Sequence, residues 1–302
     1  MVDVSNQPSE CVFSCRYGQI AALRWHAGAP VKVLALHGWL DNAASFHRLA
    51  PLLPDCDLVA MDFPGHGLSD HRAPGHIYAF FDYALEIPEV LEQLGWDKVM
   101  VLGHSLGGAI GQLFSVAEPE SVERLVMIEN LGAVPSWQPG TTADQWRKAV
   151  QKWKKHNLTH RRFYPSVEAA LAARMEATPM EPAILRPMVQ RGVAKKMLEN
   201  GQTAYHWRTD KRLRLPSLFR LTESQIQEML QATSVPTHLI LADPVTQALD
   251  YPAREQRLKA LAPESVHRLP GCHHLHLTQA PVVAELIRAF MLAESRGESG
   301  VV

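Results

Sequence analysis

Short apolar runs alternate with amphipathic stretches along the first 130 residues of the chain. The runs between residues 31 and 104 are almost continuously apolar, which is typical of strands buried on both faces of a parallel sheet. Strands are predicted at residues 11–17, 19–26, 31–38, 56–63, 98–104 and 123–130. Helical patterns at 42–53 and 77–94, and from Ser105 onward, separate the later strands. This alternation predicts an α/β fold whose central sheet is mostly parallel and carries helices on both faces.

The alternation stops after Glu129 and resumes near residue 237. Residues 134–233 show no convincing strand and carry helical patterns at 166–177 and 223–232. Strand and helix patterns then return at 237–243, 252–261, 265–271 and 280–294. We therefore predict an α/β core in two parts, residues 1–133 and 234–302, interrupted by a helical cap over residues 134–233.

The composition excludes several classes of protein. The chain has 302 residues, 46% of them hydrophobic, which suits one large globular domain with an insertion. A net charge of −1 argues against nucleic-acid partners, and no apolar run approaches the roughly 18 residues of a membrane span. The polar start of the chain predicts no secretory signal. Four irregularly spaced cysteines favour a reducing, cytoplasmic location.

The predicted cap differs from the remainder of the chain in charge. Residues 135–232 contain 17 Lys and Arg against 8 Asp and Glu, whereas the other residues contain 13 against 23. Solvated helix faces are the simpler interpretation. The alternative is a positive field over an entrance, which would favour substrates that carry a carboxylate or a phosphate.

The stretch GHSLGG, residues 103–108, has the Gly-x-Ser-x-Gly pattern. It lies between a predicted strand and a predicted helix, the context in which this pattern forms a nucleophile elbow. Gly103 and Gly107 permit a strained turn that exposes the hydroxyl of Ser105 at the edge of the sheet. The helix behind it supplies backbone N–H groups for a developing oxyanion.

A second turn is predicted to supply the other oxyanion donor. His37, Gly38 and Trp39 end the central strand. A tight turn there directs the backbone N–H of Trp39 to the same edge of the sheet. Together with the N–H of Leu106, it would form an oxyanion hole with two donors.

A cluster of histidines after the last predicted strand offers a general base. His273, His274 and His276 all follow residue 271, and one imidazole must reach Ser105 to accept its proton. No acidic or cysteine partners stand nearby at metal-ligand spacing. The residues alone leave the choice among the three open.

These motifs, in this order along the chain, resemble the α/β-hydrolase superfamily. The stretches HGWLDNAASFHRLAPLLP, DFPGHGLSDHRAPG and GCHHLHL resemble more narrowly the serine hydrolase-like (kraken-type) group. The resemblance places the base about seven residues before the Pro that opens the last helix. Counting back from Pro281 gives His274, with His273 where a Gly is usual. His66 and Asp62 are expected to stabilise a turn.

The resemblance leaves the acid of the triad open. Most relatives place an Asp three residues past a Gly at the end of the strand after the insert, where this chain has Val245. Other branches take the acid from the end of the strand before the insert, which is Glu129 here. We expect Glu129, with Asp243 and Asp250 as alternatives.

The resemblance implies a serine hydrolase that cleaves an ester, thioester or related acyl bond through a Ser-His-acid triad and an acyl-enzyme. A small, partly apolar molecule is the expected substrate, with no metal or organic cofactor. A non-catalytic ligand-binding protein on the same scaffold, or a C–C bond hydrolase with the same triad, are the alternatives. Either a monomer or a homodimer is consistent with the sequence.

Overall fold

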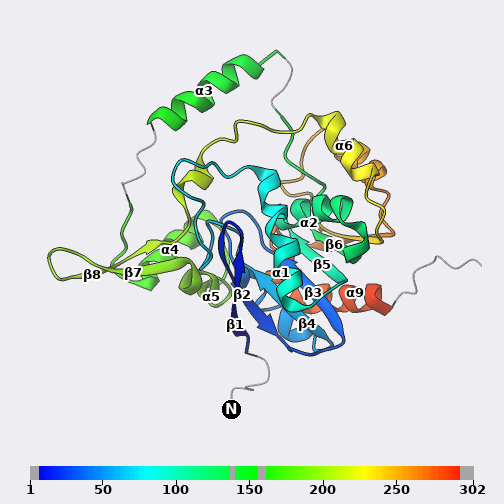
Figure 1. Ribbon diagram of the computed structural model, residues 1–302, viewed down its shortest axis with the longest axis horizontal. Coiled ribbons are helices and arrows are strands. Elements are labelled where there is room, and N and C mark those ends of the chain that lie inside the picture. Colours follow the sequence, from blue (N-terminus) through cyan, green and yellow to red (C-terminus); the bar gives the residue numbers. More distant parts are fainter. Residues whose placement is uncertain (1–6, 137–139, 156–160, 293–302) are drawn as a thin grey trace, which may run out of the picture.

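Eight strands form one central sheet within residues 7–136, 140–155 and 161–292, which the computed structural model describes (Figure 1). Their order across the sheet is β1-β2-β4-β3-β5-β6-β9-β10. β2 is antiparallel to both β1 and β4, and the remaining neighbours are parallel. The strands are β1 (Ser9–Cys15), β2 (Gly18–Trp25), β3 (Val31–Leu36), β4 (Cys56–Met61), β5 (Val99–His104), β6 (Val122–Ile128), β9 (Thr237–Asp243) and β10 (Ser265–Pro270). The predicted strands and the mostly parallel sheet are confirmed.

Both faces of the sheet are buried. Successive side chains of a strand point to opposite faces, so each strand contributes side chains to two core clusters. Leu34 and Leu36 of β3 belong to the core cluster that includes α1 (Glu86–Leu94) and α2 (Leu106–Ala117). Val33 and Ala35 belong to the opposite cluster, which includes α9 (Ala280–Leu292). This burial explains the near-continuous apolar runs in the sequence.

Two predicted helices are shorter than their patterns suggested. The segment 42–53 forms only two 3-10 turns, Ala43–Phe46 and Ala50–Leu52. The segment 77–94 forms a 3-10 turn, Phe80–Ala84, followed by α1. Prolines explain both differences, because Pro51 and Pro88 each lack an N–H and collide with the carbonyl four residues earlier in a continuous helix.

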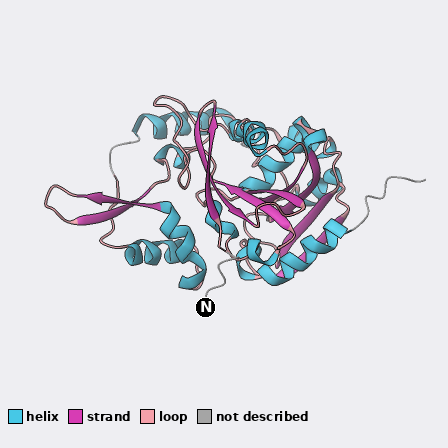
Figure 2. Cartoon of the chain, turned by 60° about the horizontal axis from the view of Figure 1, so that its bottom comes forward, coloured by secondary structure: helices cyan, strands magenta, loops and turns pink. Residues whose placement is uncertain are grey.

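The inserted segment contains helices and, contrary to the prediction, two strands. Its helices are α3 (Thr142–Lys155), α4 (Val167–Ala177), α5 (Pro182–Gly192) and α6 (Glu223–Gln231). The strands β7 (Val193–Met197) and β8 (Thr203–Trp207) form an antiparallel hairpin that projects from the body (Figure 2).

The hairpin was missed because its signal is weak in the sequence. Gly201 takes a positive φ of 78° after Asn200, as hairpin turns require. The strand before the turn is largely exposed and carries Lys195 and Lys196, so it shows little apolar alternation. The Asn-Gly pair was the signal that could have revealed it.

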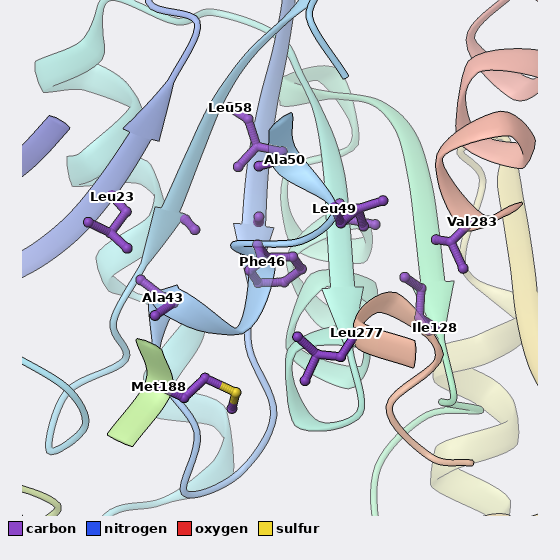
Figure 3. Packing of buried hydrophobic residues seen from close by; sticks show 14 of the residues in the cluster. Leu23, Ala43, Phe46, Leu49, Ala50, Leu58, Ile128, Met188, Leu277 and Val283 are labelled. Atoms are coloured by element: carbon purple, nitrogen blue, oxygen red, sulfur yellow. The ribbon is translucent and has the colours of Figure 1, made fainter. Parts of the chain in front are cut away.

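One buried and one partly buried ion pair attach the inserted segment to the loops that follow β4 and β3. Arg191 of α5 pairs with Asp62 at 2.9 Å, and Arg174 of α4 pairs with Asp41 at 2.6 Å. Asn42 donates to the carbonyl of Met188 at 2.8 Å. Met188 also shares one hydrophobic cluster with Phe46 of the core (Figure 3). The segment therefore covers the carboxyl ends of the parallel strands.

Asp62 also stabilises the turn after β4, as expected from the sequence. Its carboxylate accepts hydrogen bonds from the N–H groups of Ala43 and Leu68.

Among the described helices, none has the length and apolar character needed to cross a bilayer. The exact range of the cap, 134–233, stays a prediction, and α6 within it packs against α7 (Arg254–Leu261) of the second core part.

Candidate active site

Ser105 lies on a strained turn between β5 and α2. Its backbone has φ 50° and ψ −116°, a conformation that a residue with a side chain rarely adopts. A Cβ atom at Gly107 would collide with the backbone carbonyl of Leu36, and one at Gly103 with the backbone of Gly107. The two glycines are therefore required for the close approach of β3, β5 and α2 that holds this turn.

Hydrogen bonds of His37 orient the peptide that precedes Trp39. The N–H of Phe63 donates to Nε2 of His37 at 3.0 Å, so Nδ1 carries the proton and donates to the carbonyl of Gly38 at 2.7 Å. The N–H of Asp41 also donates to this carbonyl, at 3.1 Å. Because C=O and N–H point in opposite directions across a trans peptide, these bonds direct the N–H of Trp39 away from both donors.

Leu106 is the first residue of α2, so its N–H has no partner within the helix. The N–H groups of Leu106 and Trp39 thus belong to turns at the carboxyl ends of the paired strands β5 and β3. The indole of Trp39 is half-exposed, and its Nε1 donates to the carbonyl of Leu213 at 3.2 Å.

Glu129 follows β6 and is almost fully buried, with φ 53°. Its Oε1 accepts from the N–H of Ala242 at 2.6 Å, and its Oε2 accepts from Thr246 Oγ1 at 2.6 Å and from Nδ1 of His273 at 3.1 Å. Burial alone would raise the pKa of this carboxyl group. The bonds from His273, Thr246 and Ala242 outweigh it and hold the pKa of Glu129 below its usual value.

His273 lies between β10 and α8 (Leu275–Thr278), close to the nucleophile turn. Its carbonyl accepts a hydrogen bond from Nε2 of His104, the residue before Ser105, at 2.8 Å. The ring centroids of His104 and His273 are 4.9 Å apart. Because Nδ1 of His273 donates to Glu129, its Nε2 is left as a proton acceptor.

His274, the residue predicted as the base, has other partners. Its Nε2 forms an ion pair with Oδ2 of Asp41 at 3.5 Å, and Oδ1 of Asp41 binds Arg174. The rings of His273 and His274 are nearly perpendicular, at 88°, so the two neighbours face different partners. The expected pairing of Glu129 with His274 is therefore not formed, and Glu129 pairs with His273 instead.

The pairing with Asp41 predicts a pH-dependent contribution of His274 to stability. Burial lowers the pKa of this imidazole, but Asp41 and Cys272 outweigh burial and raise the pKa to about 9. The pKa of a histidine in the unfolded chain is about 6.5. Because the pKa of His274 is higher in the folded protein, its protonation stabilises the fold fully below pH 6.5, and this stabilisation is lost as the pH rises through the pKa of the folded protein.

At pH 6 the wild type should have a higher free energy of unfolding than the His274→Gln variant. We expect this difference between the two proteins to shrink by about 3 kcal/mol between pH 6 and pH 10. Urea titrations of both proteins at several pH values measure this difference. A difference that stays constant with pH would contradict the assignment of a charged His274.

Among the described residues, the other candidates form no hydrogen bond with Glu129 or His273, although the ring of His276 lies 4.1 Å from that of His104. Asp243 and Asp250 are exposed, and no described residue is bonded to either carboxylate. His276 is buried and its Nε2 contacts Ser45 Oγ at 2.7 Å. Neither Thr246 nor Asp41 was predicted as a residue of the site. Thr246 carried no signal, whereas the position of Asp41, two residues after Trp39, could have drawn attention to it.

The match to a family model extends over residues 32–277, and the description of this family is "alpha/beta hydrolase fold". The chain belongs to this family, and it is a hydrolase by fold. Within the family it falls in the serine hydrolase-like group, as the resemblance predicted. It is 28% identical to the serine hydrolase-like protein of Danio rerio over 92% of this chain and 87% of that protein. It is 30% identical to a probable serine hydrolase of Drosophila melanogaster over 91% and 85%.

A solved structure shares the fold of this chain along nearly the whole length of both proteins. The crystal structure of a hypothetical protein from Pseudomonas aeruginosa matches with a TM-score of 0.84 and 36% identity, over 94% of this chain and 99% of that one. This likeness includes the inserted segment as well as the core.

Proposed function

We propose that this chain is a serine hydrolase that cleaves a carboxylic ester or thioester through a covalent acyl-enzyme. Ser105 is the nucleophile, His273 the general base and Glu129 the acid of the triad. The observation that carries the proposal is the partly buried hydrogen bond between Glu129 and His273 beside the strained turn of Ser105.

In the first half of the reaction, Oγ of Ser105 attacks the carbonyl carbon of the substrate and its proton passes to Nε2 of His273. Glu129 holds the imidazole with Nδ1 protonated and stabilises the imidazolium that forms. The N–H groups of Trp39 and Leu106 donate to the oxyanion of the tetrahedral intermediate. His273 then returns its proton to the leaving alkoxide or thiolate.

In the second half, His273 removes a proton from water, and the hydroxide attacks the acyl carbonyl. The second tetrahedral intermediate collapses to the carboxylic acid, and Ser105 recovers its proton from His273. Every step uses groups of this chain and water, so atoms and charges balance without a co-reactant.

A fluorophosphonate probe tests this proposal directly. The folded wild type should be labelled covalently, and the Ser105→Ala variant should not, because phosphonylation needs an activated hydroxyl. Labelling is measured by intact-protein mass spectrometry. The Ser115→Ala variant is the control and should be labelled like the wild type, because Ser115 is buried in α2 and its hydroxyl donates to the carbonyl of Gln112. Folded wild-type protein that stays unlabelled would favour the ligand-binding alternative.

A further inference from the structure

A cavity of about 190 Å³ lies between the inserted segment and the loop after β3. Leu40, Asp41 and Asn42 form its wall on the core side. Leu40 directly follows Trp39, whose N–H is the proposed oxyanion donor. Asp41 pairs with His274, the neighbour of His273. The cavity therefore borders the two loops that carry the proposed oxyanion donor and the proposed base, whereas Ser105 itself does not line it.

Three arginines line the cavity, and among the described residues that line it Asp41 is the only acidic one. Arg174 is already paired with Asp41, which also holds the charged His274. The guanidinium of Arg162 lies 5.1 Å from the ring centroid of Tyr164. Within the described part of the chain, neither Arg162 nor Arg214 forms an ion pair with a carboxylate. Both residues are exposed to solvent, and the described part of the protein leaves their positive charge unpaired beside the cavity.

The remaining lining is suited to a short hydrocarbon chain. Ala173, Met188, Val189 and the indole of Trp207 provide apolar surface. A volume near 190 Å³ accommodates a few methylene groups and one small polar group, but not a nucleotide or a large headgroup. A planar carboxylate matches the two parallel N–H donors that a guanidinium presents.

We infer that this cavity binds the free carboxylate of the substrate, so that the preferred substrates are monoesters or monothioesters of short dicarboxylic acids. This inference rests on the proposed function and names its substrate class. Two arginines of the positively charged inserted segment then take part in substrate binding. Arg162 and Arg214 bind the distal carboxylate while Ser105 attacks the ester carbonyl at the other end of the acyl chain.

Two esters with acyl chains of equal length test the inference. We compare 4-nitrophenyl hydrogen adipate, which is anionic, with 4-nitrophenyl hexanoate, which is neutral. The wild type should show the higher kcat/KM for the adipate ester. The double variant Arg162→Gln/Arg214→Gln should lose at least about tenfold in kcat/KM on this ester, the usual size of a lost charge-assisted hydrogen bond, and less than about twofold on the hexanoate.

Lys148→Gln/Lys152→Gln is the matched control, because it also removes two positive charges from exposed side chains, here on α3 and outside the cavity. It should leave the preference of the wild type unchanged. A wild type without preference, or equal losses on both esters in the double arginine variant, would overturn the inference while leaving the proposed function intact. Absence of fluorophosphonate labelling at Ser105 would instead count against the proposed function.

A binding measurement decides the case in which Ser105 is labelled but neither ester is turned over. Free adipate at millimolar concentration should slow labelling of the wild type and not of the double arginine variant. Equal labelling rates with and without adipate would overturn the inference.

Discussion

Replacement of His273 by Asn is expected to lower kcat for ester hydrolysis by about ten thousandfold, the usual cost of losing a triad member. The physical reason is the bond between Nδ1 of His273 and Glu129, which leaves Nε2 of this imidazole to accept the proton of Ser105. Steady-state kinetics with 4-nitrophenyl esters of several chain lengths measure the loss. Fluorophosphonate labelling of the variant should slow in parallel, since the same base activates the hydroxyl.

The matched comparison is His274→Asn, one residue along the chain. His274 is bonded to Asp41, so its loss should reduce kcat by less than about tenfold, through a shift of the loop that carries His273. The reverse ranking of the two variants would restore His274 as the base and overturn the assignment of His273. Circular dichroism and urea unfolding confirm that both variants are folded before their rates are compared.

Replacement of Glu129 by Gln is expected to reduce kcat by about a thousandfold or more, because the amide no longer stabilises the imidazolium and can hold the wrong tautomer. Gln has nearly the same shape as Glu, so packing around Ala242 and Thr246 should persist. The loss should therefore fall on kcat rather than on KM, which a full substrate titration separates.

Asp243→Asn is the control for the acid, since this carboxylate is exposed and lies one residue from Ala242, whose N–H binds Glu129. Its kcat should remain within about threefold of the wild type, as is usual for a surface substitution. A larger loss in Asp243→Asn than in Glu129→Gln would show that the triad takes its acid from the strand after the insert.

Local sequence patterns predicted the fold and the strained turn at Ser105, because both depend on neighbours along the chain. The apolar runs at 31–38 and 98–104 predicted buried strands, and burial on both faces is what the sheet requires. Gly103 and Gly107 flank Ser105 at the spacing that the strained turn needs. Glu129 was also predicted from its place at the end of a buried strand.

The choice between His273 and His274 could not be made from sequence, because it depends on which way two adjacent side chains of an irregular loop point. Their partners, Glu129 and Asp41, lie more than a hundred residues earlier in the chain. Counting back from Pro281 gives His274, whereas the carboxylate of Glu129 is bonded to His273. The β7–β8 hairpin was missed for a related reason, since its alternation is obscured by exposed lysines.

The packing of α5 has a consequence for how substrates enter. Ile184, Leu185, Met188 and Val189 are buried in the same cluster as the core residue Phe46. Lifting this helix as a lid would expose four apolar side chains, at ~1.5–3 kcal/mol each, and would also separate Arg191 from Asp62. Such an open state is too rare to serve each catalytic cycle. We therefore expect substrates to bind with α5 in place, so that they are selected by their fit to a preformed cavity rather than by closure around them.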